Sequence, residues 1–285
     1  MQKTVEKTGQ VWYTFFVLKK DVTTLLIYDA HTHIFPDKIA EKATASIGAF
    51  YESAMYSPAA TARLLEAERE AGISRSLVCS SAVTAGQVES INTFIAGECA
   101  AHPEFLGFAA MHPDYENVAE ELDRAVSLGL RGVKFHPDFQ KFDIDDPKAI
   151  PMYREIAKRG LPVLFHTGDH RYDYSAPTKV QNIMRQIPDL VCIGAHFGGY
   201  NRWDEAMSLD KNPQLFFDTS SSLTVIDREM ALRMIDKFGP EQFLFGTDFP
   251  MWNPTEERER FFSLGLSDEE NEQICHKTFE RLFSL

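Results

Sequence analysis

The sequence LLIYDAHTH at residues 25–33 is the stretch from which the fold can be inferred. It is an apolar run that ends in alternating polar residues, and it lacks the glycines that follow the first strand of a dinucleotide-binding open sheet. Seven further apolar runs follow it along the chain: SLVCSSA (76–82), FLGFAAMH (105–112), GVKFHP (132–137), PVLFHTG (162–168), LVCIGAHFG (190–198), LFFDTSSS (215–222) and FLFGTDFP (243–250). Runs of this composition are typical of strands buried on both faces of a parallel sheet.

Segments with helical signals separate these runs. Ser57-Pro58 and Asp146-Pro147 are typical helix starts, and Gly72 is a typical helix end. Strand and helix therefore alternate eight times, which predicts an α/β fold, a (β/α)8 TIM barrel, as a single domain over residues 25–285. Residues 1–24 are expected to be an N-terminal extension. An open, doubly wound sheet is the alternative to the barrel.

Composition restricts the partners. The chain has 285 residues, of which 44% are apolar and 25% charged, as in ordinary globular proteins. Its 42 acidic and 29 basic residues give a net charge of -13, which disfavours nucleic acid or an anionic membrane as partner and leaves a small-molecule substrate. The four cysteines show no C-x-x-C or zinc-finger spacing, so we expect reduced thiols and a cytoplasmic location. The sequence is also compatible with a homo-oligomer.

Polar residues with metal-binding chemistry end several of the predicted strands. Barrel enzymes place their sites at this end of the strands. The residues are His31, His33, Lys134, His136, His166, His196 and Asp248. Side chains two positions apart leave a strand on the same face, so His31 and His33 can chelate one cation. That spacing alone is a weak signal, but the later histidines and the aspartate make coincidence a poor explanation.

These motifs resemble the amidohydrolase superfamily. The resemblance is narrower for the amidohydrolase-related branch (family 2), which includes aminocarboxymuconate-semialdehyde and resorcylate decarboxylases. It covers about residues 25–285, and its carriers are DAHTH (29–33), RGVKFHP (131–137), LFHTGD (164–169), GAHFGG (194–199) and FGTDFP (245–250). The resemblance implies a divalent metal, usually zinc, at the barrel mouth. It further implies that the metal ligands are His31, His33, His166 and Asp248, and that Asp248 and His196 are catalytic.

The remaining candidates concern substrate binding and the metal count. Lys134 has three readings: a carbamate that bridges two metals, a cation that binds a substrate carboxylate, or a partner in a structural ion pair. One metal per chain is favoured, and two follow only if Lys134 is carboxylated. His136 lies on the same strand face as Lys134, and Arg171 and Arg202 follow the fifth and sixth strands, so all three are candidates for substrate contact.

Three functions compete on this site. The first is a metal-dependent hydrolase acting on a small, carboxylate-bearing molecule, with Asp248 taking the proton of an activated water and His196 polarising the carbonyl. The second is a metal-dependent lyase, a decarboxylase or hydratase, in which Lys134 or Arg171 holds the carboxylate. The third is a barrel that binds a metal or ligand without catalysis. That reading predicts a missing ligand, whereas all five family positions are filled.

Overall fold

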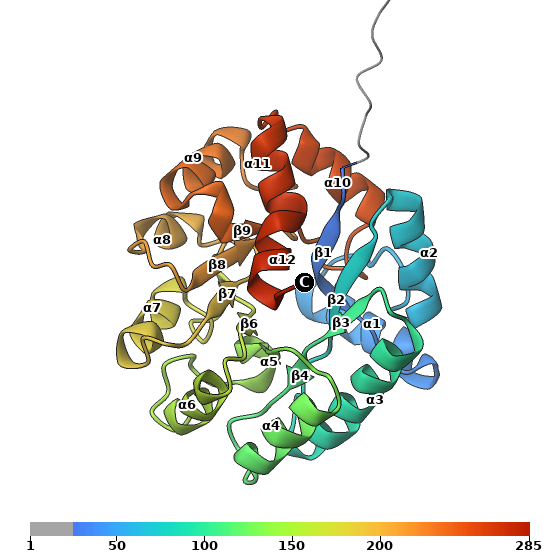
Figure 1. Ribbon diagram of the computed structural model, residues 1–285, viewed down its shortest axis with the longest axis vertical. Helices are drawn as coiled ribbons and strands as arrows, with labels where there is room; N and C mark the ends of the chain where they lie inside the picture. The colour runs from blue at the N-terminus through green and yellow to red at the C-terminus, as the bar shows by residue number, and fades with distance from the viewer. Residues whose placement is uncertain (1–24) are drawn as a thin grey trace, which may run out of the picture.

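A ring of parallel strands surrounded by helices forms the computed structural model of the chain, which describes residues 25–285 (Figure 1). Each strand pairs in parallel with its neighbours in the orders β1-β2-β3 and β4-β5-β6-β7-β8-β9. The strands within these residues are β1 (Tyr28–His33), β2 (Arg75–Cys79), β3 (Phe105–Gly107), β4 (Ala109–Ala110), β5 (Val133–Phe135), β6 (Val163–Phe165), β7 (Cys192–Gly194), β8 (Leu215–Asp218) and β9 (Phe243–Leu244).

Backbone hydrogen bonds join the two sets of strands into one barrel. β3 and β4 belong to one apolar run that is interrupted at Phe108. At the other seam, the N–H of Ala30 donates to the carbonyl of Phe245 and the N–H of Asp248 donates to that of His31, each over 2.8 Å. The nine assigned strands therefore correspond to the eight apolar runs of the sequence, and the predicted (β/α)8 barrel is confirmed.

Helices surround this barrel, and the last of them crosses one of its ends (Figure 1). They are α1 (Asp37–Tyr51), α2 (Thr61–Ala71), α3 (Val88–Ala101), α4 (Val118–Ser127), α5 (Pro137–Gln140), α6 (Ile150–Lys158), α7 (Pro177–Gln186), α8 (Trp203–Ser208), α9 (Arg228–Phe238), α10 (Pro254–Phe262), α11 (Asp268–Glu272) and α12 (Thr278–Phe283). Short turns of other helix types are η1 (Ala85–Gln87), η2 (Pro240–Gln242) and η3 (Gln273–Lys277).

The predicted ends of the second helix were half correct. Gly72 ends α2 in the left-handed conformation, with φ 71°, as expected for a glycine C-cap. The predicted start at Pro58 was wrong, because the backbone of Ala59 is bonded elsewhere: its N–H donates to Oγ1 of Thr44 and its carbonyl accepts from Phe35. These bonds keep the chain extended until Thr61.

The C-terminal helix closes one end of the barrel. In Figure 1, α12 lies across the centre of the ring of strands. Its Phe279 and Phe283 pack in one core cluster with inward-facing strand residues such as Leu106, Leu164 and Leu244. Tyr28, at the beginning of β1, contacts Phe279 with 5.5 Å between ring centroids, so α12 covers the N-terminal ends of the strands. The opposite end is left for the site.

Two expectations about the surroundings of the protein stay predictions. Between Leu25 and Leu285, no helix is both long and apolar enough to cross a membrane. All four cysteines are free thiols, as the sequence suggested, but this does not test the cytoplasmic location. The N-terminal extension over residues 1–24 lies outside the described residues, so the domain boundary is likewise untested.

Candidate metal centre

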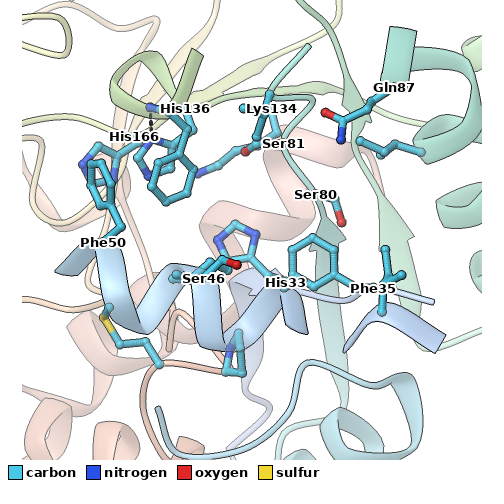
Figure 2. A pocket seen from close by; sticks show the side chains of 18 of the residues that line it. His33, Phe35, Ser46, Phe50, Ser80, Ser81, Gln87, Lys134, His136 and His166 are labelled. Atoms are coloured by element: carbon cyan, nitrogen blue, oxygen red, sulfur yellow. Dashed lines mark hydrogen bonds between the residues drawn. The ribbon is translucent and has the colours of Figure 1, made fainter. Parts of the chain in front are cut away.

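A cavity of about 870 Å³ lies at the C-terminal ends of the strands (Figure 2). Seven of the nine site residues predicted from the sequence line this one cavity: His31, His33, Lys134, His136, His166, His196 and Asp248. They come from β1, from β5, from the segments after β5, β6 and β7, and from the segment after β9. The barrel thus brings together side chains that are up to 217 positions apart in the sequence, His31 and Asp248.

Three of these side chains form a compact cluster, the His31–His33–Asp248 cluster. The Nε2 atoms of His31 and His33 are 3.2 Å apart. Oδ1 of Asp248 lies 3.6 Å from Nε2 of His31 and 3.2 Å from Nε2 of His33. Ligand atoms held about 2.0–2.1 Å from one tetrahedral zinc are roughly 3.3 Å from each other. The three distances match this spacing, so the cluster fits a divalent metal.

The electrostatics of the cluster also favour a cation. Although burial opposes ionisation, the nearby histidines, first His31, hold the pKa of Asp248 well below its usual range. Burial likewise opposes a charge on His33, but the neighbouring Cys79 and Asp248 raise its pKa to about 9. Asp248 is therefore ionised, and its carboxylate and the environment of His33 favour a positive charge at this point. Burial, and next the charge of Lys134, instead lower the pKa of His31 to about 4, so its ring is neutral, as a ligand must be.

The backbone at Asp248 is held in an uncommon conformation. Asp248 has φ 59°, in the left-handed region that costs a non-glycine residue about 1–2 kcal/mol. Its N–H donates to His31, and Oδ2 accepts a hydrogen bond from Oγ of Ser221. Nε1 of Trp252 in turn donates to that Oγ over 2.8 Å. The hydrogen bond to His31 in β1 therefore holds the strained backbone of Asp248, and the bond from Ser221 holds its carboxylate.

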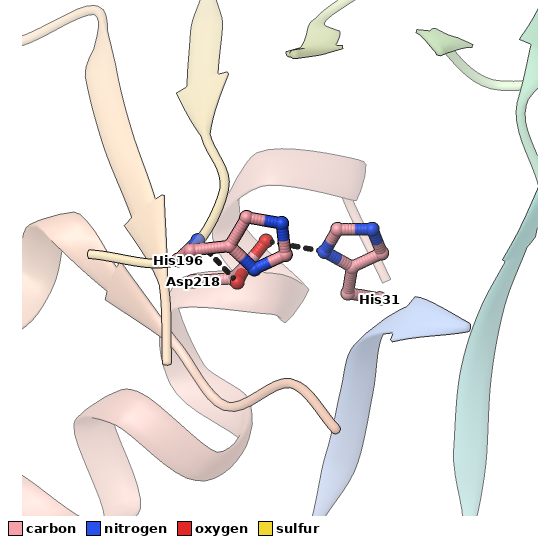
Figure 3. Close-up of side chains that lie close together, drawn as sticks. All are labelled: His31, His196 and Asp218. Atoms are coloured by element: carbon pink, nitrogen blue, oxygen red, sulfur yellow. Dashed lines mark hydrogen bonds and ion pairs between the residues drawn. The ribbon is translucent and has the colours of Figure 1, made fainter. Parts of the chain in front are cut away.

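Asp218, at the end of β8, orients His31 from behind the metal cluster (Figure 3). Oδ2 of Asp218 lies 2.9 Å from Nδ1 of His31, and Oδ1 accepts hydrogen bonds from the N–H groups of His196 and Ser220. A carboxylate only accepts, so Nδ1 of His31 carries the proton and Nε2 is free to ligate. Although burial opposes it, the interaction with His31 lowers the pKa of Asp218 to about 2.

His166 and His196 form a second contact beside the cluster. Nδ1 of His166 lies 3.0 Å from Nε2 of His196, whose own Nδ1 lies 3.0 Å from Oγ of Ser220. Burial lowers the pKa of both histidines, so both are neutral at neutral pH. Nε2 of His166 is buried and has no hydrogen-bond partner within residues 25–285. His166 is in neither group of side chains whose possible ligand atoms all lie within 4.8 Å of one another, His31–His33–Asp248 and His31–His196–Asp218, so its predicted ligation stays untested.

Lys134 is fully buried and lies close to the metal cluster. Its Nζ is 2.9 Å from Nε2 of His31, and burial lowers the pKa of its ammonium group. His136 stacks between Phe139 and His166, at centroid distances of 3.6 and 4.1 Å. Both side chains face the cavity, where a bound molecule would meet them.

The two predicted arginines are placed differently. Arg171 folds back on Asp169, with 2.9 Å between Nε and Oδ1 and 2.7 Å between Nη2 and Oδ2, and its guanidinium covers the outer face of Phe50. Arg202 pairs with Asp173 over 2.7 Å and with Glu205. Neither lines the cavity, and both charges are already paired with carboxylates.

Sequence reasoning missed three residues of the site. Asp218 ends the apolar run LFFD, and a charge at the end of a buried strand was a usable signal. Asp138 follows directly after the fourth-strand motif, lines the cavity, and lies 3.6 Å from Nε2 of His166 through Oδ2. Tyr51 has no such signal: its Oη lies 2.8 Å from Nε2 of His136 only because α1 ends over the barrel mouth.

Solved structures with this fold were found, and the three described here are each less than 20% identical to this chain. The 5-carboxyvanillate decarboxylase from Novosphingobium aromaticivorans, complexed with manganese, has a TM-score of 0.72 and 14% identity, covering 92% of this chain and 97% of that one. The 2,6-dihydroxybenzoate decarboxylase from Rhizobium has a TM-score of 0.70 and 18% identity, covering 91% and 98%. A probable 2-pyrone-4,6-dicarboxylic acid hydrolase from Acinetobacter baumannii has a TM-score of 0.66 and 15% identity, covering 91% and 99%.

A search of curated proteins found no match to this chain. The family model for amidohydrolase, that of amidohydrolase-related family 2, matches residues 28–285. This match spans nearly all of the described chain, from the first strand to the last helix. The chain therefore belongs to the amidohydrolase family, in the branch that the motifs of its sequence indicated.

Proposed function

We propose that this protein is a metal-dependent decarboxylase acting on a carboxylate-bearing molecule with an apolar body. The observation that carries the proposal is the contrast between the two parts of the cavity. One end holds the His31–His33–Asp248 cluster and Lys134, whereas much of the remaining wall is apolar, with Phe35, Ile47, Phe50, Ile91, Phe94 and Phe139. Such a cavity suits a molecule that is charged at one end and apolar elsewhere.

The His31–His33–Asp248 cluster would hold the divalent metal, and His166, which lines the same cavity, is the further ligand that the sequence motifs imply. When bound, the metal supplies Lewis-acid chemistry that polarises oxygen atoms at this end of the cavity. Zinc remains our expectation, because imidazole and carboxylate ligands suit it. Manganese is the competitor, since the Novosphingobium neighbour holds it.

Side chains of the protein bind the substrate, exclude water and transfer the proton. Lys134 binds the substrate carboxylate as a cation. The ammonium group and the carboxylate then neutralise each other inside the buried cavity. The apolar walls exclude water, so the carboxylate loses hydration that would stabilise it against loss of CO2. Asp248, ionised in the free protein, takes up a proton from solvent before the substrate closes the cavity and delivers it to the carbon that CO2 leaves, so one proton is consumed for each CO2 released. The electron pair of the broken C–C bond thereby becomes the new C–H bond.

Hydrolysis, which the sequence placed first, is the second candidate. It is favoured by the probable hydrolase among the structural neighbours and by the position of Asp248, which suits a base for water as well as an acid for carbon. The named decarboxylases among the neighbours favour the lyase.

One incubation separates the two functions. The metal-loaded protein is supplied with a panel of hydroxybenzoates and related carboxylates, and both CO2 release and oxygen-18 uptake from labelled water are measured. We expect CO2 release without label in the product, and loss of that activity by about 100- to 10,000-fold in Asp248→Asn. Labelled product without CO2 would establish the hydrolase instead, and Asp248→Asn with near-full turnover would refute the role of this carboxylate.

A further inference from the structure

We propose that the substrate is an elongated amphipathic carboxylic acid whose apolar tail lies along α1, rather than a single-ring acid. This inference rests on the proposed function, because it assumes that the carboxylate end lies at Lys134 and the metal cluster. Its starting point is size. A cavity of about 150 Å³ is enough for benzene, whereas this cavity measures about 870 Å³ and reaches the upper range of ligand pockets.

One face of α1 forms a wall of the cavity over most of the helix length. The lining residues on α1 recur at helical spacing: Lys38, Ile39, Ala43, Ser46, Ile47, Phe50 and Tyr51. From Ile39 to Phe50 the helix rises about 16 Å at 1.5 Å per residue. The other face of α1, with Ala40, Thr44 and Gly48, is buried against the protein. A wall of this length serves a long molecule and exceeds the needs of a small one.

The opposite wall is formed around α3. Figure 2 shows Ser46 and Phe50 on one side of the cavity and Gln87, which directly precedes α3, on the other. Ile91 and Phe94 of α3 also line the cavity. At the rim, Ile39 and Val83 are 42% and 48% exposed, although both are large apolar side chains. Apolar side chains left open to water at the rim of a cavity are typical of a ligand-binding groove.

The bound metal and Lys134 set the orientation of the molecule, because they offset the carboxylates at that end of the lining, whereas the other cations of the lining, Lys38 and Lys141, have no metal beside them. The two carboxylates of the lining, Asp138 and Asp248, both lie at the histidine end, and α1 and α3 contribute no carboxylate to the wall. The charged residue that α1 contributes is Lys38, at its first turn. The groove between α1 and α3 therefore accepts an apolar tail, while the anionic head is drawn to Lys134 and the metal cluster.

Binding of straight-chain carboxylic acids tests this inference without depending on turnover. The metal-loaded full-length protein is titrated calorimetrically with the series from butanoic to dodecanoic acid. We expect affinity to rise by about fourfold per added methylene group until the groove is filled. An affinity that does not change with chain length would overturn the inference.

A pair of variants on α1 locates the tail. Ala43→Trp places an indole in the groove, and Ala45→Trp places the same side chain on an exposed position outside this cavity. Ala43→Trp should abolish the dependence on chain length while butanoic acid binding and metal content stay unchanged, and Ala45→Trp should match the wild type. Equal behaviour of the two variants would contradict the assignment.

The outcome is distinguishable from failure of the proposed function. If the protein releases no CO2 from any acid but binds long acids more tightly than short ones, the groove assignment holds and the decarboxylase is wrong. If it decarboxylates single-ring acids and shows no preference for longer molecules, the decarboxylase holds and the groove assignment is wrong.

Discussion

Nδ1 of His31 donates a hydrogen bond to Oδ2 of Asp218 over 2.9 Å, and both side chains are almost fully buried. This bond sets the tautomer of His31 and points its Nε2 at the cavity. We predict that Asp218→Asn weakens metal binding by roughly 10- to 100-fold without abolishing it, because an amide has one acceptor oxygen and cannot serve both the Nδ1 proton of His31 and the N–H groups of His196 and Ser220. Competition with a chelator measures the affinity.

The control for that variant is Asp227→Asn, at the N-cap of α9 and away from the cavity. It should leave the metal affinity unchanged even if it lowers the free energy of unfolding. Unchanged affinity in Asp218→Asn would show that His31 does not need this partner.

Lys134→Met separates the readings of the buried lysine. If Lys134 binds the substrate carboxylate, the variant keeps its metal content, and kcat/KM falls by about 10-fold or more through a higher KM, since a charge-assisted contact contributes roughly 1.5–3 kcal/mol. Steady-state kinetics with elemental analysis checks this. A fall from two metals per chain to one, with wild-type metal loading dependent on bicarbonate, would establish the carbamate instead.

The buried carboxyl group of Glu68 should make the free energy of unfolding depend on pH. Burial, and next the charge of Asp29, raise the pKa of Glu68 well above its usual value, and its Oε2 accepts from Oγ of Ser76. The folded state therefore holds this proton more tightly than the unfolded state. Its contribution to stability is full below the unfolded pKa, about 4.3, and is lost as the pH rises toward the folded pKa.

In Glu68→Gln that loss is absent, so the free energy of unfolding should fall less between pH 5 and pH 8 than in the wild type. Urea unfolding of the metal-free proteins at both pH values measures the difference. Parallel pH profiles would mean that Glu68 does not carry a raised pKa.

Removal of residues 1–24 tests the domain boundary. The family match begins at residue 28, and every site residue lies beyond that point. We predict that the shortened protein keeps the metal content and turnover of the full chain, measured side by side. Loss of metal on removal would place the boundary elsewhere.

The barrel could be predicted from the sequence because its strands are apolar on both faces and its site residues end them. That pattern depends only on local order along the chain, and so DAHTH and FGTDFP could be placed at one end of the barrel before their contacts were known. The single break at Phe108 was not predictable. There the ring sits over Gly132, where a Cβ would come within 2.3 Å of it, a contact between distant segments.

The parts of the site that sequence reasoning missed depend on loops and helix ends. Tyr51 reaches His136 through the path of α1 across the barrel mouth, which no local pattern encodes. Arg171 and Arg202 pair with Asp169 and Asp173 outside the lining of the cavity, so their predicted contact with substrate stays a prediction. The barrel fixes the positions of side chains at strand ends, whereas the positions of loop side chains depend on the partners that they contact.

The central claim is that His31, His33 and Asp248 hold a divalent metal, and elemental analysis of purified wild type and His33→Ala tests it most directly. We predict about one divalent metal per chain in the wild type and almost none in His33→Ala, with activity lost in parallel. Retention of the full metal content by His33→Ala, or full activity of metal-free wild type, would contradict the account.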